Sequence, residues 1–560
     1  MAETARRVYA LSRTLTDQMS GNWDIDATLH FHARTKYRVW TGPSGEPDYV
    51  MGTPPAVEPP IWEEDWSILP RPYKVYPTLP PLALPADLAH THMPALEALA
   101  RSGLDVGPNA PLPDRTALAQ VARLSNGLLH RRHVGRVTKR AVEFRTAGAT
   151  GGFYHLELYF VCGDLPDLPA GVYHYATQDH SLRRLRAGDL RGVLVAASGG
   201  EAHLAQAPLA LVMTSTFWRN AFRYRARAYR HAFWDAGTAL AHVLGVAASL
   251  HLPARLVLGF ADQAVNALLG VDGEREAAVA ICSLGHGLSA PSPPAHLHPI
   301  AHPTEPLSQR EVTFADIPRM HAASCLSSGE DAAAWRGAPL RRTLPPAQGN
   351  VIPLEPRALD GLPQAPIEEV ILARRSVRHY DTDRPITFEH FSTALDRSAR
   401  PFAADCLALD SPPLHDNYLI VNTVAGLSPG IYLHRTREGT IEPLRSGNYR
   451  DDAAHLAVDQ SYAADAHVNS YYLTELGPVL ATYGNRGYRL AQLEAALYAG
   501  RLHLAAQALG LGAVGSTSLD DEVVAFFSPR AADASYMFIT VFGARRRRAA
   551  TTQAGPPVPH

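Results

Sequence analysis

A stretch of the chain at about 111–285 alternates short apolar runs with turn residues and ends in a long helical pattern. The runs Leu156–Cys162, Gly171–Tyr175 and Gln206–Thr216 have the length and the β-branched and aromatic content that are typical of buried strands. A helical periodicity then covers Tyr229–Leu250. Strands that precede a long helix predict an α+β domain.

A second stretch, at about 366–545, follows the same order. Its long helix has leucines at helical spacing, at positions 490, 493, 497 and 504, with alanines and Gly500 among them. The long helix of the first stretch is also rich in small residues, including Gly237, Ala241 and Gly245. Because the distance between two packed helices depends on the side chains at their contact, we expect these two helices to lie close together.

A shift of 259 residues aligns the two stretches without gaps. The matched pairs include Gly171/Gly430, Tyr173/Tyr432, Leu185/Leu444, Arg186/Arg445, Tyr224/Tyr483, Arg227/Arg486, Tyr229/Tyr488, Arg230/Arg489, Leu250/Leu509, Ala254/Ala513 and Asp262/Asp521. One offset that holds over both stretches indicates a tandem duplication. We therefore predict two similar α+β domains that form a pseudo-dimer within one chain, with two independent domains on a linker as the alternative.

Proline content separates these stretches from the rest of the chain. The proline-rich first part is expected to wrap over another surface, and the proline-rich middle part to be a linker with one short helix near Asp331–Arg336. The predicted divisions are an extended segment at 1–110, a first domain at 111–286, a linker at 287–365, a second domain at 366–548 and a flexible tail at 549–560.

Composition narrows the class of protein. The 560 residues are 46% hydrophobic and 19% charged, with a net charge of −2, which fits a globular protein of more than one domain and gives no reason to expect a nucleic-acid or membrane partner. No apolar run has the length of a membrane span, and the N-terminus lacks the apolar core of a signal peptide. The four cysteines are isolated, and the HxH pairs have no carboxylate companion motif, so we expect a cytoplasmic protein without a disulfide framework or a metal site.

A cluster of arginines is the strongest chemical signal. Arg374, Arg375, Ser376 and Arg378 lie within five residues, after a predicted helical turn. Guanidinium groups bind phosphate through charge-assisted hydrogen bonds, and a serine hydroxyl adds a donor. At the 259-residue offset the first copy keeps only Arg115 of the three arginines. The alternative interpretation is a solvated basic patch.

The first copy has a feature that the second lacks. Residues 146–152 read Thr-Ala-Gly-Ala-Thr-Gly-Gly, and glycines let backbone N–H groups approach a ligand closely. The aligned segment, Asp405–Ser411, has no glycine and two carboxylates. Only the second copy ends in an arginine run, which begins at Arg545. These complementary losses predict one complete site at the junction of the two copies and one site that has lost its ligands. The alternative is that the sequences of both copies drifted independently.

Together these motifs resemble the nitroreductase fold, and specifically the SagB-type (SagB/ThcOx-like) FMN-dependent azoline dehydrogenases in a tandem-domain form. The segments that carry the resemblance are Phe31–Tyr37, Tyr73–Pro77, Ala149–Tyr159, Leu168–Tyr175, Arg374–Arg378 and Tyr483–Arg489. In that fold FMN lies between two domains. The resemblance implies that the phosphate is held by Arg374, Arg375, Ser376, Arg378 and Arg545, and that the ring system is contacted by Thr150, Gly151, Gly152, Gly515, Ser516 and Thr517.

The resemblance also implies the chemistry. Azoline dehydrogenases oxidise thiazoline or oxazoline rings of a ribosomally made peptide to thiazoles or oxazoles; a flavin accepts the hydride, a base takes the proton, and molecular oxygen reoxidises the flavin. The implied partners are an azoline-containing precursor peptide and a cyclodehydratase complex. The family's Lys-Tyr pair is replaced by Arg223-Tyr224 in the first copy and Thr482-Tyr483 in the second. We expect Arg223 to lower the pKa of Tyr224, which makes Tyr224 the first candidate base and Tyr483 the second.

Two other functions remain open at this point. One is a flavin oxidoreductase of the same fold that acts on another small molecule or peptide bond. The other is a non-catalytic scaffold subunit of a cyclodehydratase complex, suggested by the missing lysine.

Overall fold

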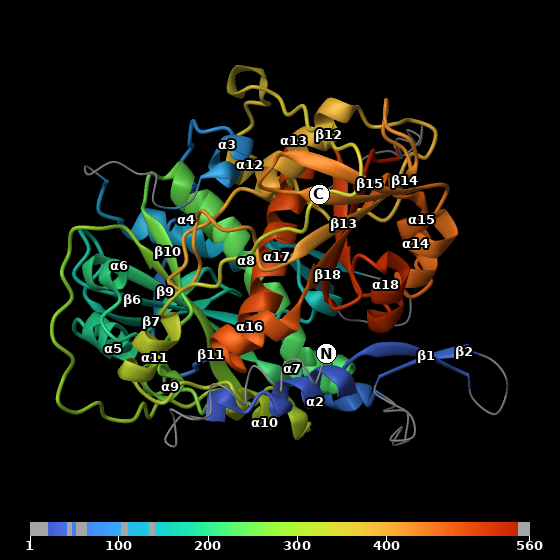
Figure 1. Cartoon of the computed structure of the whole chain (residues 1–560). Coiled ribbons are helices and arrows are strands. Elements are labelled where there is room, and N and C mark those ends of the chain that lie inside the picture. Colours follow the sequence, from blue (N-terminus) through green and yellow to red (C-terminus); the bar gives the residue numbers. More distant parts are fainter. Residues whose placement is uncertain are drawn as a thin grey trace, which may run out of the picture.

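The computed structural model describes residues 21–41, 47–51, 64–101, 103, 110–133 and 141–546, so the predicted tail at 549–560 lies outside the described residues. The core consists of two seven-stranded antiparallel sheets, with the long helices α8 (Ala228–Ser249) and α17 (Arg486–Ala508) between them (Figure 1). This arrangement confirms the predicted α+β class. Below, the first half denotes the elements up to β11 (Glu276–Leu284), and the second half those from α10 (Asp316–Ala323) onward.

The strands of the two sheets follow the same order. The first sheet runs β10 (Ala254–Val257), β11, β9 (Leu209–Thr216), β6 (Leu156–Cys162), β7 (Gly171–Ala176), β8 (Ser181–Ala187) and β3 (Pro81–Ala83). The second runs β17 (Gly512–Ser516), β18 (Ser535–Gly543), β16 (Val468–Thr474), β13 (Asp416–Val421), β14 (Gly430–Arg435), β15 (Thr440–Ser446) and β12 (Ile352–Pro353). Four strand pairs, β7/β14, β8/β15, β9/β16 and β11/β18, begin 259 residues apart, the offset found in the sequence.

Shorter helices also recur in both halves. The first half contains α3 (Ala95–Ala100), α4 (Arg115–Asn126), α5 (Arg191–Ala197), α6 (Ala202–Gln206), α7 (Phe217–Tyr224) and α9 (Asp262–Leu269). The second contains α11 (Gly329–Arg336), α12 (Ile367–Ala373), α13 (Phe388–Ser398), α14 (Arg450–Leu456), α15 (Ser461–Asp465), α16 (Leu476–Tyr483) and α18 (Asp520–Phe527). The remaining elements are α2 (Asp26–Arg34), the hairpins β1 (Tyr37–Thr41)/β2 (Pro47–Met51) and β4 (Leu128–His133)/β5 (Ala141–Arg145), and single turns of 3₁₀-helix at Gly21–Trp23, Trp66–Ile68, Thr150–Gly152, Arg225–Arg227 and Leu359–Gly361.

The two long helices pack directly against each other, as their small residues predict. A Cβ atom on Gly237 of α8 would overlap the carbonyl oxygen of Leu493 and lie 2.9 Å from the amide nitrogen of Leu497. A Cβ atom on Gly500 of α17 would lie 2.9 Å from the Cβ atom of Ala241. Glycine is therefore needed at both crossings for the backbones to approach this closely.

The N-terminal helix α2 is tied to both halves by one buried ion-pair cluster. Asp520 of α18 accepts hydrogen bonds from Arg227 at 2.9 Å and Arg230 at 2.5 Å. Arg230 also donates to the hydroxyl of Thr35 at 2.9 Å and to the carbonyl of His32 at 2.7 Å. The segment predicted to wrap over another surface therefore packs into the junction of the two halves.

Part of the predicted linker repeats this arrangement. Asp262 of α9 accepts hydrogen bonds from Arg486 and Arg489, each at 2.6 Å. Arg489 also donates to the hydroxyl of Ser324 at 2.8 Å and to the carbonyl of His321 at 2.8 Å. Helix α10 thus holds in the second half the place that α2 holds in the first, and the interval 287–365 is more than a connection. Its flanking prolines concealed this short helix, whereas the predicted helix near Asp331–Arg336 is present as α11.

The structure corrects two matches of the gapless alignment. Asp262 corresponds to Asp520, not to Asp521, because β17 and α18 come one residue early relative to the 259-residue offset. The counterpart of the arginine cluster is the end of α3 at Arg101, not Arg115: α3 and α12 pack on the long helices in the same way, as do α4 and α13. The hairpin β4/β5, which has no counterpart among the described residues of the second half, shifts the alignment there.

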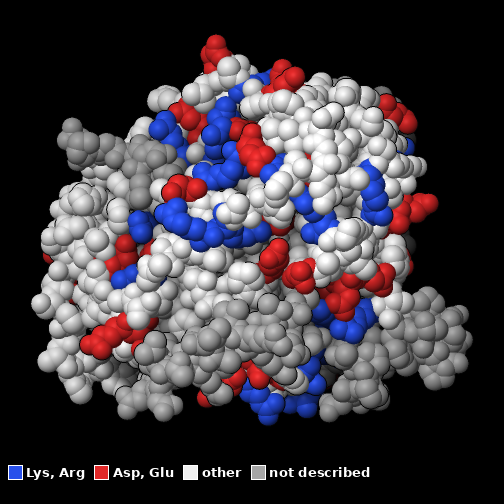
Figure 2. Space-filling model, in the orientation of Figure 1, with Lys and Arg blue, Asp and Glu red and all other residues white. Residues whose placement is uncertain are grey.

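On the face shown in Figure 2, basic and acidic side chains are interspersed. Among the described residues, the helices are all too short or too polar to span a membrane.

Candidate functional site

A cavity of about 550 Å³ opens where the two halves meet. The first half supplies Tyr37, Gly148, Ala149, Thr150, Gly151, Arg223, Tyr224, His231, Trp234, Asp235 and Thr238. The second half supplies Arg374, Ser376, Arg378, Val458, Gln460, Tyr462, His503, Val514, Gly515, Ser516, Thr517 and Phe538. The arginine cluster and the glycine turn, which are 228 residues apart when measured from Thr146 to Arg374, therefore lie on one cavity.

One end of the cavity is basic. Arg374 follows α12 and is 7% exposed, yet its guanidinium has no carboxylate within ion-pair distance in the described part of the chain. It donates only two long hydrogen bonds, of 3.2 and 3.3 Å, to the carbonyl of Thr146 in the other half. Burial lowers its pKa to about 10. Ser376 and Arg378 lie beside it, with the Arg378 guanidinium 5.9 Å from the ring centroid of Tyr462.

Two predicted phosphate ligands do not line this cavity. Arg375 is exposed and donates to the carbonyls of Leu372 and Arg374, each at 2.7 Å. Arg545 donates to the carbonyl of Leu511 at 2.8 Å and to the side chain of Gln507. Both guanidiniums are thus engaged with backbone or side-chain oxygens at the edge of the second half.

The glycine turn forms another part of the cavity wall. Gly151 has φ +66°, in the left-handed region, and a Cβ atom on it would lie 2.7 Å from the hydroxyl of Tyr224. Asp235 of α8 holds the turn: its carboxylate accepts from the Thr150 amide at 2.9 and 3.0 Å and from the Thr150 hydroxyl at 2.8 Å. It also accepts from Nε2 of His155 at 2.7 Å. Gly152 shares the turn but does not line the cavity.

Residues at the end of strand β17 complete the site. Gly515 and Ser516 end β17, and Thr517 follows them along the cavity wall. The Ser516 hydroxyl is 2.7 Å from that of Tyr462, and Arg227 donates to the Thr517 hydroxyl at 3.2 Å. Ser516 is therefore held by a side chain of the second half and Thr517 by a side chain of the first.

Arg223 lowers the pKa of Tyr224 as expected, but the net shift of this pKa is upward. Burial raises the pKa of Tyr224 to about 12, and the opposing charge of Arg223 is too weak to reverse this. The Arg223 side chain is half exposed and lies 3.5 Å from the carboxylate of Glu64, so solvent and an opposite charge weaken its field. Tyr224 does line the cavity, but it is protonated at neutral pH.

Tyr483, the second candidate base, lies elsewhere. Its hydroxyl donates to the carbonyl of Cys406 at 2.8 Å and accepts from the amide of Leu340 at 2.8 Å. Its ring packs against Trp335, with centroids 5.4 Å apart. The hydroxyl therefore has both a hydrogen-bond acceptor and a hydrogen-bond donor within the fold, and Tyr483 serves as a packing residue.

Tyr483 marks the counterpart of the cavity in the other half, and that counterpart is filled. At the 259-residue offset, His231, Trp234 and Thr238 of α8 become Leu490, Leu493 and Leu497 of α17. The indole of Trp335 from α11 is buried there, and a space of only about 10 Å³ remains beside it, Leu490 and Leu493. Among the residues that the structure describes, only one of the two equivalent positions has room for a ligand of more than a few atoms.

Several cavity residues escaped the sequence analysis. The main ones are Tyr37, His231, Trp234, Asp235, Thr238, Val458, Gln460, Tyr462, His503 and Phe538. The repeat contained a signal for three of them, because polar or aromatic residues of one long helix align with leucines of the other. Comparing the two copies for chemical differences inside the helices, not only in the loops, would have located this face.

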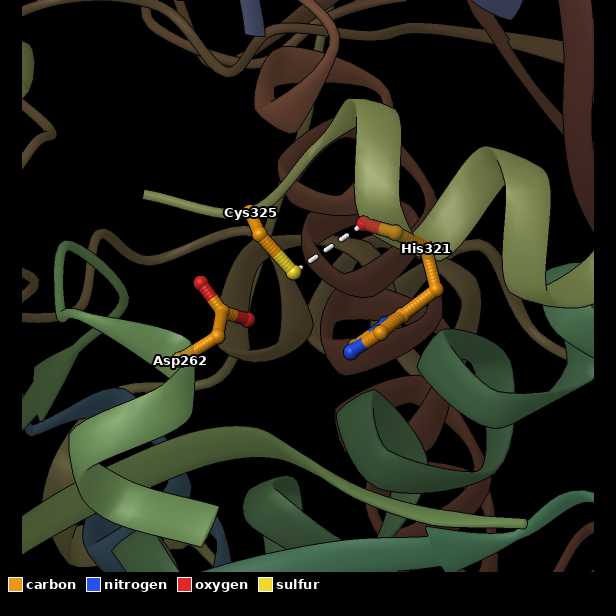
Figure 3. A group of neighbouring side chains, drawn as sticks. All are labelled: Asp262, His321 and Cys325. Carbon is orange, nitrogen blue, oxygen red and sulfur yellow. Dashed lines mark hydrogen bonds between the residues drawn. The ribbon is translucent and has the colours of Figure 1, made fainter. Parts of the chain in front are cut away.

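A second cluster of potential ligands lies away from the cavity. Asp262, His321 and Cys325 face one another between α9 and α10 (Figure 3). The guanidiniums of Arg486 and Arg489 already occupy both carboxylate oxygens of Asp262. A metal ion would meet two buried positive charges there, so the cluster is explained as the ion-pair arrangement that also exists around Asp520.

Comparison with known proteins agrees with this geometry. Residues 137–286 match the model of the nitroreductase family. The crystal structure of a "putative nitroreductase" from Anabaena variabilis superimposes with a TM-score of 0.69 at 25% identity, covering 93% of this chain and 99% of that one. The chain therefore has a nitroreductase fold over nearly its whole length.

A curated relative matches a shorter region. The "Putative nitroreductase MJ1384" of Methanocaldococcus jannaschii is 27% identical over 128 residues, which is 23% of this chain. The match spans 65% of that relative's length.

Proposed function

We propose that the protein is an FMN-dependent oxidoreductase that dehydrogenates thiazoline or oxazoline rings of a ribosomally synthesised peptide. The observation that best supports a bound FMN concerns Arg374, whose buried guanidinium has no carboxylate partner among the described residues and lies at a ligand-sized cavity. Buried charges in folded proteins are normally paired, so an unpaired one facing a cavity points to an anionic ligand.

The cavity fits FMN in size and in chemistry. Its volume of about 550 Å³ falls within the range of small-molecule sites. Arg374, Ser376 and Arg378 would hold the phosphate. Trp234 and Phe538, whose ring centroids are 5.2 Å apart, give the other part of the cavity an aromatic surface suited to a planar ring system.

When bound, FMN would supply the redox chemistry by accepting a hydride from the substrate. The chain's own residues then have three tasks. The Thr150–Gly151 turn, held by Asp235, orients the ring system from the first half; the backbone at Gly515–Thr517 does so from the second. Tyr224 lies beside Gly151 and presents a protonated hydroxyl to the cavity.

We further propose that the two halves form a pseudo-dimer within the chain, with one cofactor site between them. The common strand order, the packing of α8 on α17, and the paired clusters around Asp520 and Asp262 support this arrangement. The filled counterpart of the cavity, with Trp335 buried in it, supports a single FMN per chain.

The substrate rests on the sequence motifs that resemble the SagB-type enzymes. An azoline-containing precursor peptide, a cyclodehydratase complex as partner and molecular oxygen as electron acceptor belong to the same proposal. A nitroreductase-fold enzyme that oxidises another small molecule or peptide bond is the second candidate, since the cavity fits the cofactor whatever the substrate.

The test begins with the purified protein and its visible spectrum. A bound flavin with FMN as its released form is expected, and a colourless protein that takes up no added FMN would exclude both enzymatic candidates in favour of a scaffold. The FMN-loaded protein is then mixed with a thiazoline-containing peptide in air. Loss of two hydrogen atoms per ring by mass spectrometry is expected; an unchanged peptide mass with bound FMN would leave the second candidate.

A further inference from the structure

The loop between α14 and α15 has a strained backbone where it borders the cavity. Val458 has φ +59° and Asp459 has φ +52°, both in the left-handed region. Glycine adopts this region readily and aspartate tolerates it, whereas a β-branched residue such as valine is a clear exception there. Val458 is half-buried and lines the cavity, while Asp459 is exposed and does not line it. The more strained of the two residues is therefore the one on the cavity.

The first half builds the same loop with two glycines. The loop between α5 and α6 begins and ends 259 residues earlier, and its aligned residues are Gly199, with φ +62°, and Gly200, with φ +75°. In that loop the amide of Gly199 donates to the carbonyl of Ala196 at 3.0 Å. The amide of Val458 donates in the same way to the carbonyl of His455 at 2.9 Å. Glycine would therefore form this backbone without strain in the second half too.

Helix α11 occupies the space in front of Gly199. A Cβ atom on Gly199 would overlap the carbonyl oxygen of Gly329 and lie 2.8 Å from the Cβ atom of Ala333, both in α11. A Cβ atom on Gly200 would meet no atom within 4 Å. The same helix carries Trp335, which fills the counterpart of the cavity. A segment of the chain thus passes where a side chain at position 199 would point.

Val458 presents its side chain to the cavity at the position equivalent to Gly199. Its isopropyl group adds apolar surface to the wall, but it requires a left-handed backbone that only glycine adopts freely. Strained residues of this kind cluster at ligand sites, and an observed outlier supports a hypothesis of function. The contribution of the side chain to the cavity therefore explains valine at this position.

We propose that Val458 is a specificity-determining residue, whose isopropyl group limits the size of the substrate residue that enters the cavity next to the azoline ring; this rests on the proposed function. The filled counterpart indicates how a peptide would lie there. In it, residues 329–333 pass the position equivalent to Val458, and Trp335 packs against Tyr483, with ring centroids 5.4 Å apart. A peptide bound in the cavity in the same way would place one ring beside Tyr224, the equivalent of Tyr483, and a neighbouring residue against Val458.

The specificity is tested with two thiazoline peptides that differ in the residue next to the ring, glycine in one and phenylalanine in the other. The ratio of their kcat/KM values is measured with the FMN-loaded protein. Val458→Gly should shift this ratio toward the phenylalanine peptide by about 10-fold or more, since a few carbon atoms in an apolar pocket have effects of this size. Val458→Leu should shift the ratio the other way. A ratio that Val458→Gly leaves unchanged would overturn the proposal.

A matched control lies in the same loop. Asp459→Gly also replaces a left-handed residue by glycine, but at an exposed position outside the cavity, where solvent screens its pair with His455. Both glycine variants should melt no lower than the unmodified protein and keep its FMN affinity, and only Val458→Gly should change the ratio. Equal shifts in the two variants would attribute the preference to a flexible loop and contradict the role of the side chain. A lower melting temperature or weaker FMN binding in Val458→Gly alone would instead assign Val458 to the fold or to the cofactor.

A second measurement does not depend on the peptide. Bound FMN is reduced with dithionite in the absence of air, and menadione, a bulky quinone, then takes up its two electrons, with two protons supplied by the reduced flavin and water. Val458→Gly should be reoxidised faster than Asp459→Gly, because only the first change widens the cavity. If the unmodified protein binds FMN but leaves both peptides unchanged, the proposed substrate is wrong, and the quinone rates still decide whether Val458 limits access. Equal rates in the two glycine variants would show that it does not.

Discussion

At the scale of single residues, the motifs located one site but not its full set of groups. Arg374, Ser376 and Arg378 line the cavity together with Thr150 and Gly151. The others that line it as predicted are Arg223, Tyr224, Gly515, Ser516 and Thr517. Gly152, Arg375, Arg545 and Tyr483 do not, because a motif gives the order of residues and not the direction of their side chains. Adjacent residues in extended backbone point to opposite sides, which separates buried Arg374 from exposed Arg375.

The two adjacent arginines give a matched prediction. Arg374→Gln should weaken FMN binding by about 10- to 100-fold, since a hydrogen bond to a charged group is worth about 1.5–3 kcal/mol. Arg375→Gln removes the same charge from an exposed position outside the cavity and should weaken binding far less. Fluorescence titration of the apoprotein with FMN measures both. Equal losses would mean that net charge, and not the buried contact, holds the phosphate.

At the scale of elements, α8 and α17 share a position in the fold but differ in chemistry. Both are almost wholly buried and cross at glycines. On α8 the face toward the cavity carries His231, Trp234 and Thr238, whereas α17 has leucines at the aligned positions. Helical periodicity predicts both elements equally well because it records only which positions are buried.

The crossing of these helices predicts an unusual sign for one substitution. Glycine to alanine in a helix usually stabilises by up to about 1 kcal/mol. Gly237→Ala should instead destabilise by about 1–3 kcal/mol, because the new methyl group meets the backbone of α17, which cannot move aside. Gly477→Ala is the control in α16, where a Cβ atom meets no atom within 4 Å. Denaturant unfolding compares the two; a Gly237→Ala variant as stable as Gly477→Ala would contradict the close crossing.

The ion-pair cluster of α9 predicts a loss that depends on pH. Asp262→Asn leaves Arg486 and Arg489 buried without their carboxylate and should destabilise by about 3–5 kcal/mol at pH 7. Although burial opposes ionisation, the two arginines hold the pKa of Asp262 below its ordinary value. Its stabilisation is therefore complete above the unfolded pKa of about 4 and is lost as the pH falls further, toward the folded pKa.

The difference in melting temperature between the unmodified protein and Asp262→Asn should thus narrow between pH 7 and pH 3. Asp410→Asn is the control, because Asp410 pairs with Arg341 on the surface, where solvent screens the pair, and the melting temperature should change far less. A difference that stays constant with pH would show that the carboxylate charge of Asp262 is not what stabilises the cluster.

At the scale of the whole molecule, equivalent positions of the two halves hold one cavity and one packed core. The cavity draws residues from both halves, and its counterpart holds Trp335 among leucines. Apolar packing of this kind stabilises the fold, whereas the cavity leaves Arg374 unpaired and Nε2 of His231 unsatisfied. Stability and ligand binding are therefore divided between the two positions.

This division predicts the cofactor content of the chain. The protein saturated with FMN should contain one FMN per chain, measured from the flavin absorbance after denaturation against the protein concentration. Trp335→Ala enlarges the filled counterpart but supplies no phosphate ligand, so the ratio should stay at one. A ratio of two in either protein would contradict the single composite site.

The sequence by itself determined the α+β class and the repeat, because these depend on local periodicity and on comparison of the chain with itself. It also placed the arginine cluster and the glycine turn in different copies. Only the tertiary structure decided that Arg374 reaches the carbonyl of Thr146, that Nε2 of His231 has no hydrogen-bond partner among the described residues, and that Trp335 from the proline-rich interval fills the other position. Those facts depend on side-chain direction and on contacts between distant segments, which periodicity along the chain does not record.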